Sequence, residues 1–584
     1  MPKNPMSLSL EQISPFNRDF FSSKEVMAYI GSGSIGGKAS GLGFIKNTIT
    51  SQLSTGSFGD ISVGIPRLIV IAAYVFDCFM ERNKLESASF AEMENDRIAH
   101  VFQKAEFPAE FLGDLRSIIA SVQTPLAIRS SSMLEDAIYE PFAGVYATKM
   151  IPNNQPDIDV RFRKLVEAIK FVYASTYFTS ARDYIQMTGH SPCDEKMAVI
   201  IQEVVGRRNN ERFYPHISGV ARSHNFYPMG SATQEEGIVN LALGLGKTIV
   251  DGGIVWSYSP AHPRATPPFS SPGDLLRQTQ TEFWAINMGK PPEYDPIRET
   301  EYMVQCPLSC AELDGTLSFV ASTYRPQDDR LVMGTGPDGP RALTFSPLLV
   351  GNEIPINDLL KELLRLCEEA VACPVEIEFA LTLGPKQALP AQFGFLQVRP
   401  MVVSNAQIDI TNAEMEDPRV IAASQTSLGN GIIEDITNVV YVRPEVFEAK
   451  HTPRIARELQ DINRRLIAAG RPYILIGFGR WGSSDPWLGI PVEWADVSGA
   501  KVLVEATLPD MNVELSQGAH FFHNLTSFQI SYLSIPHTGK YAIDWEWLSE
   551  QEVIEESAFI KHIRTKDPIT IKVDGRCGRG VILR

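Results

Sequence analysis

The stretch VEIEFALTLGPKQALPAQFGFLQVRP, residues 375–400, predicts two β-strands separated by a Gly-Pro turn. In the first strand Glu376 and Glu378 lie two residues apart, so a strand points both carboxylates to one face. The apolar residues beside them fill the opposite face: Val375, Ile377 and Phe379. Two carboxylates on one face of an apolar strand repel each other unless a cation lies near them.

The second strand adds polar groups that suit a bound cation. Gln397 and Arg399 fall on one face of this expected partner strand. Carboxylate and amide oxygens are ligands suited to Mg²⁺, which also accepts substrate phosphates. The two strands therefore predict a magnesium site, and a polar, solvent-facing ribbon is the alternative that these residues alone leave open.

A glycine-rich segment, GSGSIGGKASGLG at 31–43, stands between a short apolar run and a helical pattern. Its glycines match G-x-G-x-x-G, but the run at 26–30 is a poor buried parallel strand. A P-loop does not fit, because Ser32 replaces the glycine six residues before Lys38 and Ala39 replaces the Ser or Thr after it. Backbone amides, a helix N-terminus and Lys38 favour a phosphate cradle, with a glycine-rich turn and a solvated lysine as the equal alternative.

A third candidate is LAIRSSSMLEDAIYEPFAGVY at 126–146. A β-like start delivers Arg129 into three serines, followed by Glu135 and Asp136. Arginine suits bidentate contact with phosphate oxygens. The serines favour anion binding modestly over a surface ion pair, the usual role of an arginine at a strand end.

The composition is that of a globular chain with several domains. The 584 residues are 44% hydrophobic and 21% charged, which is enough apolar material for more than one core. Lys and Arg number 53 against 69 Asp and Glu, a net charge of −16, and no basic run occurs. Nucleic acid is therefore not an expected partner, because such binding depends on clustered basic residues.

The sequence also argues against a membrane partner, a secreted location, structural zinc and a disulfide framework. No apolar stretch reaches the ~18 to 20 residues of a membrane span, so no membrane partner is expected. The polar start MPKNPMSLSL lacks the apolar core of a signal peptide, which favours a cytoplasmic address. The seven cysteines include no C-x-x-C pair beside histidines, so neither structural zinc nor a disulfide framework is expected.

Strands and helices alternate along the chain, which predicts an α/β architecture. Helical patterns cover 157–187, 357–371 and 452–470. Further strands are expected at 197–205, 217–222, 473–477 and 501–505.

Local signals mark the ends of some of these elements. Asn357 or Asp358 can cap the second helix, and the third runs from Thr452 as N-cap to Gly470 as its stop. The proline-rich stretch 260–295 is expected to be a surface excursion. A domain boundary is expected after Pro400, where an apolar strand gives way to a polar segment.

The three candidate motifs, in this order, resemble the ATP-grasp nucleotide-binding domain of the phosphoenolpyruvate synthase and pyruvate phosphate dikinase family. That family has GGK-x-A-x-L, A-V-R-S-S-A-x-x-E-D with F-A-G, Q-x-M-V, S-G-V-x-F, G-L-G-E, D-I-E-W and L-x-Q-x-R-P. The chain reads GGKASGLG (36–43), AIRSSSMLED with FAG (127–144), IIQEVV (200–205), SGVARS (218–223), GLGK (244–247), EIEF (376–379) and LQVRP (396–400). The resemblance runs in register as far as Pro400.

This resemblance implies a mixed α/β fold that begins with an ATP-grasp domain. That domain would cover 1–405, with lobes roughly at 1–195 and 196–405, and a smaller α/β domain would cover 406–584. ATP and Mg²⁺ are the cofactors that it implies.

The resemblance also implies roles for individual residues. Carried over position by position, Lys38 and Arg129 would hold the ATP phosphates. Glu378 and Gln397 would hold Mg²⁺. The remaining positions would surround them: Glu376 as the neighbouring acid, Arg399 on the phosphate side, and Gln202, Glu203 and Val204 along the adenine.

Two departures from the family pattern matter. The family's first strand acid is Asp, and here it is Glu376, which is longer by a methylene. The acid of G-L-G-E is replaced by Lys247, a charge reversal close to the expected nucleotide. Lys247 would either contact a phosphate or mark altered chemistry.

The family's phosphate acceptor is a histidine in G-G-x-[ST]-[SC]-H-A-A on a swivelling domain, and a separate barrel handles pyruvate. This chain has no such motif, and residues 406–584 are too short for that barrel. A divergent swivelling domain would place SQGAHFFHNLTSFQI (516–530) at the phosphohistidine segment. His520 and His523 are the candidate phosphoryl carriers there, and a structural or acceptor-binding role is the favoured alternative.

Another segment of the second half stands out. GRWGSSDPWLG at 479–489 places Trp481 and Trp487 in a Gly/Ser/Asp/Pro loop. Loops that carry large aromatic side chains are often functional, so we expect a binding loop rather than core.

The sequence thus favours a dikinase-type phosphotransferase that moves a phosphoryl or pyrophosphoryl group from ATP to a histidine or another acceptor. The acceptor would be a small molecule or a protein, and a homodimer is compatible with this hypothesis. The alternative is a nucleotide-binding regulatory or interaction protein with a degenerate dikinase site. A dinucleotide oxidoreductase is disfavoured, because a single G-x-G-x-x-G would have to outweigh several motifs in register.

Overall fold

A computed structural model of the chain divides it into two compact units. The first comprises Met1–His224, Met229–Ile249 and Ile254–Pro400, and the second comprises Asn225–Pro228, Val250–Gly253 and Met401–Arg584. The residues that the structure describes are 10–53, 58, 61–132, 145–187, 195–225, 232–251, 253–265, 275–276, 279–351, 354–384, 391–401, 408–483, 485–516, 525, 530–575 and 577–584.

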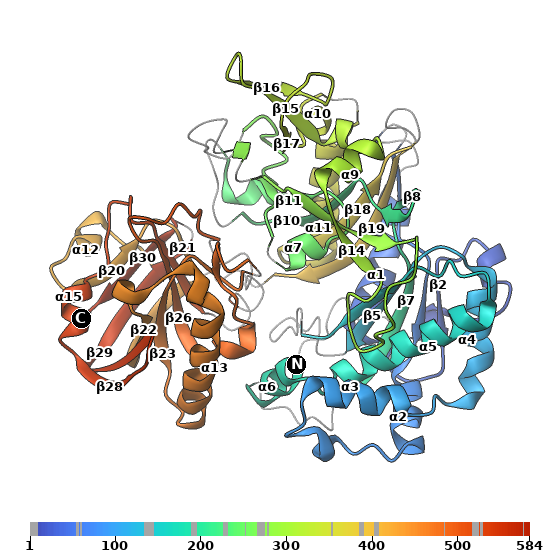
Figure 1. Cartoon of the computed structure of the whole chain (residues 1–584), viewed down its shortest axis with the longest axis horizontal. Helices are drawn as coiled ribbons and strands as arrows, with labels where there is room; N and C mark the ends of the chain where they lie inside the picture. The colour runs from blue at the N-terminus through green and yellow to red at the C-terminus, as the bar shows by residue number, and fades with distance from the viewer. Residues whose placement is uncertain are drawn as a thin grey trace. The chain divides into compact units, whose positions relative to one another are not determined.

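The first sheet of unit one is mixed and has the order β1-β2-β4-β7-β5-β6. Figure 1 labels β2, β5 and β7 of this sheet. Its strands are β1 (Ser14–Pro15), β2 (Met27–Ile30), β4 (Leu68–Ile71), β7 (Met197–Glu203), β5 (Leu126–Ser132) and β6 (Thr148–Ile151). The first three are parallel, and β7 and β5 run antiparallel to their neighbours. The run that we judged a poor parallel strand is therefore β2, and that judgement was wrong, because parallel neighbours on both sides bury most of it.

The second sheet has the order β12-β11-β10-β18-β19-β3. Its strands are β12 (Trp256–Tyr258), β11 (Ile238–Ala242), β10 (Ile217–Arg222), β18 (Val375–Thr382), β19 (Ala391–Pro400) and β3 (Ile61–Gly64). All neighbours are antiparallel except β3, which comes from the N-terminal part of the chain and lies parallel to β19.

Helix α1 (Gly36–Gln52) joins the two sheets. It contacts β5 and β7 of the first sheet, β19 of the second, and helix α11 (Ile356–Val371). Its buried residues belong to one apolar core that includes side chains of both sheets: Ala39, Leu42 and Ile45 with Val70, Ile200, Ile377, Phe379 and Val398. Strands β5 and β19, which carry site residues, are therefore both anchored on α1.

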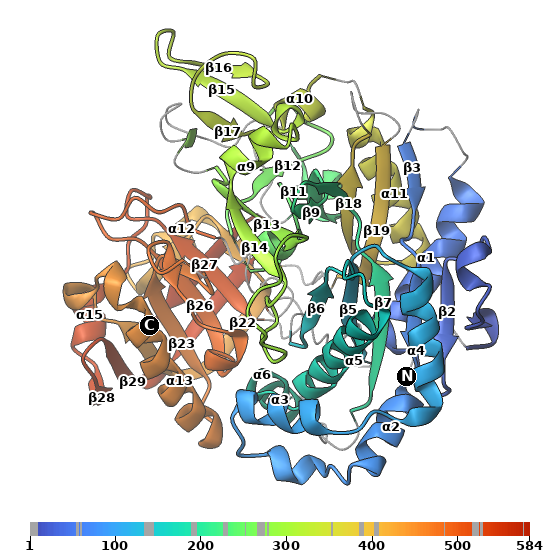
Figure 2. The ribbon, with the colours of Figure 1, turned by 45° about the vertical axis from the view of Figure 1, so that its right-hand side comes forward.

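Other helices cover the remaining surfaces of the first sheet. In Figure 2, α5 (Ile158–Ser175) lies beside β5, β6 and β7, and α3 (Asn95–Lys104) and α4 (Ala109–Ser121) lie against α5. A cluster of aromatic rings fills this layer: Phe76, Phe79, Phe102, Phe107 and Tyr173.

Two smaller antiparallel sheets complete unit one. The first has the order β14-β13-β9-β8, with β14 (Met303–Pro307), β13 (Glu282–Asn287), β9 (Arg212–Tyr214) and β8 (Arg207–Asn209). The other has the order β16-β15-β17, with β16 (Arg330–Met333), β15 (Ala321–Arg325) and β17 (Arg341–Leu343). Strand β13 lies inside the stretch that we expected to be a surface excursion, and its Phe283 is fully buried, so that expectation was partly wrong.

Unit two is built on a sheet with the order β20-β30-β29-β22-β23-β26-β27-β21, and β28 also pairs with β29. Its strands are β20 (Val420–Ser424), β30 (Arg579–Leu583), β29 (Ile560–Asp574), β22 (Asn430–Val442), β23 (Tyr473–Phe478), β26 (Ala500–Ala506), β27 (Ser531–Ile535), β21 (Ser427–Leu428) and β28 (Glu552–Glu556). The strands β22, β23, β26 and β27 are parallel, and helix α13 (Thr452–Ala468) connects the first two. Strands β20 and β21 stand at opposite ends of this order, and only two residues of the chain, Gln425 and Thr426, separate them.

The predicted strands are confirmed, and the predicted helices differ in detail. The segment 157–187 forms α5 and a separate helix, α6 (Thr179–Met187). The backbone N–H of Thr179, the first residue of α6, donates to the Asn95 side chain at 2.8 Å, and this contact favours a new helix start there. Asn357 does not cap α11, since its side chain donates to the Leu349 carbonyl.

The N-cap of the third predicted helix lies one residue before Thr452, the residue that we expected. The N-cap of α13 is His451, and the Thr452 hydroxyl donates to the carbonyls of Ala449 and Pro486 instead of capping. Over the part of the chain that the structure describes, no helix combines the length and the apolar character needed to cross a membrane.

His216 gives the first unit a titratable weak point. It precedes β10 and is buried, and its Nδ1 accepts a hydrogen bond from the Leu383 backbone N–H at 3.1 Å. Burial, with a smaller contribution from the charge of Arg207, lowers the pKa of His216 to about 4. The unfolded chain binds a proton near pH 6.5 and the folded chain does not, so stability is present above that pH and falls between pH 6.5 and 4.

We therefore expect His216→Gln to lose this pH dependence. Between pH 7 and pH 5 the wild-type unfolding free energy should fall by about 2 kcal/mol more than that of the variant. Urea unfolding at both pH values, followed by pulsed hydrogen exchange in β10 and β18, measures the difference. Exposed His100→Gln is the control, and equal pH slopes for wild type and His216→Gln would contradict the assignment.

Candidate functional site

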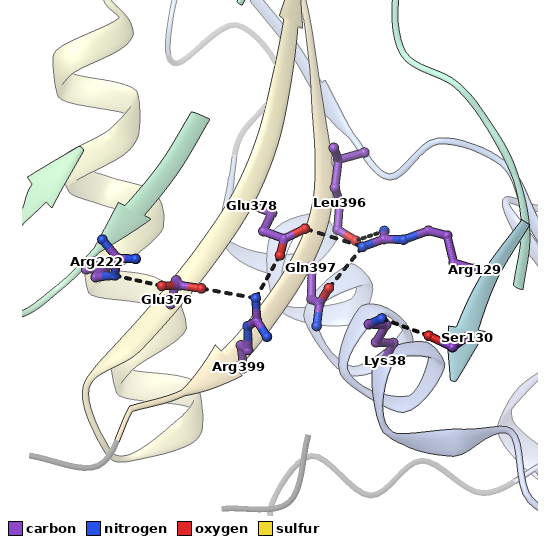
Figure 3. Close-up of polar contacts among 9 residues, drawn as sticks. All are labelled: Lys38, Arg129, Ser130, Arg222, Glu376, Glu378, Leu396, Gln397 and Arg399. Carbon is purple, nitrogen blue, oxygen red and sulfur yellow. Dashed lines mark hydrogen bonds and ion pairs between the residues drawn. The ribbon is translucent and has the colours of Figure 1, made fainter. Parts of the chain in front are cut away.

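Arg129 of β5 connects the two six-stranded sheets of unit one (Figure 3). Its Nη1 donates to the Leu396 carbonyl at 2.9 Å and to Gln202 Oε1 at 3.3 Å. Its Nη2 donates to Gln397 Oε1 at 2.9 Å and to Glu378 Oε2 at 3.3 Å. One largely buried guanidinium thus has acceptors on β7, β18 and β19.

Glu378 and Gln397 present two oxygens to one point. They are direct partners in the β18–β19 ladder, so their side chains share a face, as the strand pattern predicted. Arg129 Nη2 lies within hydrogen-bond distance of both oxygens and marks the place where they converge on positive charge. A carboxylate and an amide oxygen that converge in this way form a donor set that fits Mg²⁺, which usually takes few protein ligands and completes its shell with water and phosphate.

A second cation, Arg399, offsets the repulsion expected between the carboxylates of Glu376 and Glu378. Arg399 Nη2 lies 2.8 Å from Glu378 Oε1 and 3.2 Å from Glu376 Oε1. On the other side of Glu376, Arg222 Nε donates to Oε2 at 2.7 Å. The expected positive charge between the carboxylates is therefore present, and it is a guanidinium.

Lys38 lies in the first turn of α1, and Figure 3 shows it beside Ser130 on β5. Its Nζ is 3.3 Å from the Ser130 hydroxyl, and the residue is buried. Next to it, Ser131 Oγ accepts from the Ala39 backbone at 3.1 Å and donates to the Ile35 carbonyl at 2.8 Å. The serines do not form an exposed anion-binding turn, because β5 continues through all three and buries them.

The strand predicted to border an adenine is β7, and it ends at Glu203. Gln202 is buried, and its amide oxygen accepts from Arg129. The backbone N–H of Glu203 donates to the Arg67 carbonyl and that of Val204 to the Pro125 carbonyl. A nucleobase contact at these residues would therefore use other atoms.

Lys247 starts the short helix α7 (Lys247–Val250). Its Nζ lies 4.0 Å from Glu299 Oε2, so the reversed charge has an acidic neighbour on the loop between β13 and β14. The preceding turn is held by the Ser218 hydroxyl, which donates to the Gly244 carbonyl at 2.7 Å.

Several predicted residues cannot be placed. Glu135 and Asp136 lie outside the described residues, and so do both candidate acceptor histidines, His520 and His523.

The predicted binding loop of unit two, residues 479–489, has one tryptophan in the core and one on the surface. Trp481 is 1% exposed, and its indole N–H donates to the Val504 carbonyl, so the expectation of a binding residue was wrong there. Trp487 is 71% exposed.

The arrangement brings together Lys38, Arg129, Glu376, Glu378, Gln397 and Arg399. Three of these groups are cations on different elements, α1, β5 and β19, and they surround a face that also carries carboxylate and amide oxygens. Such a site can neutralise a polyphosphate and fix its orientation. Two of its residues were missed: Ser130, which was seen only as part of a serine run, and Arg222, whose register with Glu376 no local pattern reveals.

A match to a known family covers most of the first unit and extends past its end at Pro400. The family model described as "Pyruvate phosphate dikinase, AMP/ATP-binding domain" matches residues 32–419, which is more than half of the chain. No curated protein matches the chain.

Gly36 is the tightest point of the site's backbone and offers a test of it. Its φ is +78°, and a Cβ there would lie 1.6 Å from the Ser131 carbonyl oxygen. Gly36→Ala must therefore move the start of α1 away from β5, and we expect ATP binding to weaken by at least about tenfold. Calorimetric titration with ATP measures the loss. Gly113→Ala, in α4 and with open space around its Cβ, is the control, and wild-type affinity in Gly36→Ala would contradict the placement.

Proposed function

Because the chain belongs to the family of the pyruvate phosphate dikinase AMP/ATP-binding domain, we propose that it is an ATP- and Mg²⁺-dependent phosphotransferase of the dikinase type. The family supports ATP binding and dikinase-type phosphotransfer in general. Transfer of a phosphoryl or pyrophosphoryl group by this chain to a histidine or another acceptor is the proposal.

The convergence at Arg129 Nη2 carries this proposal. Glu378 and Gln397 direct their oxygens at that point, and Lys38 and Arg399 add positive charge from α1 and β19. A site used only for structure would have no need to gather cations from a helix and two sheets around one pair of strands. The same set suits a nucleotide triphosphate, whose charge needs both cations and a metal ion.

The proposed division of labour follows from the side chains. Lys38 and Arg129 would bind phosphate oxygens, and Arg399 would hold the phosphate side of the site. Glu378 and Gln397 would hold Mg²⁺, which when bound neutralises phosphate charge and orients the group to be transferred. Catalysis would then consist of positioning and electrostatic stabilisation.

His520 and His523 in unit two are the candidate acceptors, and a structural or acceptor-binding role is the favoured alternative. A neutral imidazole nitrogen is nucleophilic near pH 7 and can form an N–P bond. Attack on the γ phosphorus would break its bond to the bridging oxygen and release ADP, and transfer of a pyrophosphoryl group from the β phosphorus would release AMP. A cytoplasmic address and a homodimer stay predictions.

A nucleotide-sensing regulatory protein is the second candidate function. Two observations favour it: Lys247 stands where the family has an acid, and two arginines already engage Glu378. If this candidate holds, ATP binds but no phosphate, ADP or AMP is released.

Lys38 gives the direct test of turnover. We expect Lys38→Gln to lower ATP-dependent product formation at least about a hundredfold, because a cation at the phosphates is removed. Release of ADP, AMP and phosphate is measured by chromatography, with Lys46→Gln on the same helix as the control. Equal rates for Lys38→Gln and wild type would reject Lys38, and no release by wild type would reject phosphotransfer.

Labelled ATP tests the acceptor. With [γ-³²P]ATP and [β-³²P]ATP in parallel, we expect an acid-labile protein label that His523→Asn or His520→Asn removes. The control is His451→Asn, a histidine at the start of α13 in the same unit. Labelling that survives in the double variant His520→Asn/His523→Asn would place the acceptor elsewhere.

A further inference from the structure

Arg222 is a charged residue of the site that the family resemblance assigns no role. It ends β10 and is the direct cross-strand partner of Glu376 on β18. Its Nε donates to Glu376 Oε2 at 2.7 Å, and the two side chains are 12% and 2% exposed. The pair is therefore buried, and its geometry is set by the register of two neighbouring strands.

The registers on both sides of β18 arrange the site in two rows. In one row Glu378 lies between Val220 on β10 and Gln397 on β19. In the other row Glu376 lies between Arg222 and Arg399. The two acids share one face, yet only Glu376 has a cation from each neighbouring strand.

This difference separates the roles of the two acids. Each oxygen of Glu376 already meets a guanidinium, Oε2 that of Arg222 and Oε1 that of Arg399. Glu378 is more exposed, at 18%, and its Oε2 faces the point shared with Gln397. Glu378 also pairs with two guanidinium groups, those of Arg129 and Arg399, so burial is what separates the two acids. A carboxylate that is 2% exposed and held from both neighbouring strands is a poorer ligand for a hydrated metal ion than one that is 18% exposed.

The sequence carries a matching signal. Arg222 stands where the family pattern S-G-V-x-F has Phe, and Glu376 stands where D-I-E-W has Asp. Both departures fall on one cross-strand pair. An arginine and a longer acid thus occur together at positions 154 residues apart.

We propose that Arg222 is a positioning residue that holds Glu376 as the anchor of Arg399 and keeps it from acting as a metal ligand. This inference rests on the proposed Mg²⁺-ATP site. Glu376 fixes Arg399 from one side, so that the guanidinium can also reach Glu378. The metal is left to Glu378 and Gln397.

Equilibrium binding of Mn²⁺ to the full chain tests the proposal without turnover. Electron paramagnetic resonance counts free Mn²⁺ with the non-hydrolysable analogue AMP-PNP present. Arg222→Gln removes one of the two cations that compete with a metal ion for Glu376, so we expect Mn²⁺ to bind about tenfold tighter. Arg222→Lys keeps the charge and should stay within about threefold of wild type.

A double variant separates positioning from simple loss of an ion pair. Arg222→Gln/Glu376→Gln removes both charges, and we expect Mn²⁺ affinity within about threefold of wild type, since no ligand is lost. Glu378→Gln, which removes a proposed ligand, should weaken binding at least about tenfold. Arg212→Gln is the matched control, because Arg212 forms a 2.7 Å ion pair with the buried Asp314 outside the site.

The outcomes decide the proposal independently of phosphotransfer. It is overturned if Arg222→Gln binds Mn²⁺ like wild type, if it changes only as Arg212→Gln does, or if the double variant falls to the level of Glu378→Gln. It is also overturned if no variant binds Mn²⁺. The expected Mn²⁺ pattern in a chain that releases no ADP or AMP would keep the role of Arg222 and reject the proposed reaction. If Arg222→Gln does not fold, Arg222→Met, which keeps the length of the side chain without its charge, replaces it with the same expected tightening.

Discussion

The guanidinium of Arg129 is the interaction on which the site depends. It originates on one sheet and finds acceptors on both, with Gln202 on β7 and with Glu378, Leu396 and Gln397 on β18 and β19. A charged group this deeply placed must have its donors satisfied, and these partners do so. Because its partners lie on separate sheets, the distance between those sheets is part of the geometry of the site.

Helix α1 fixes the distance between the two sheets, because it packs against both. It packs on β5, which carries Arg129, and on β19, which carries Gln397 and Arg399. Its own first turn supplies Lys38, and the Ser131 hydroxyl fixes this turn through Ala39 and Ile35. The apolar core therefore aligns cations from three elements, and Glu376 and Glu378 offset part of their mutual repulsion.

The parts of this arrangement that follow from the two-residue alternation of side chains along a strand could be predicted from the sequence. Alternation along 375–400 placed both glutamates on one face and Gln397 with Arg399 on the partner strand, and the ladder confirms it. What could not be predicted depends on partners distant in the chain. Asn95 divides one expected helix into two, parallel neighbours make β2 a buried strand, and the link from Arg222 to Glu376 requires a register that neither strand encodes alone. Burial of the serine run has the same origin, since β5 continues wherever β7 offers a partner.

The pairing of β3 with β19 has a consequence for the order in which the protein is made. Strand β3 (Ile61–Gly64) leaves the ribosome long before its neighbour β19 (Ala391–Pro400), which also carries two residues of the site. At common synthesis rates the interval is on the order of tens of seconds. Throughout that time the nascent chain holds an edge strand without a partner, and Lys38 of α1 has no second sheet to face. Nucleotide recognition can therefore begin only when nearly all of the first unit has been synthesised.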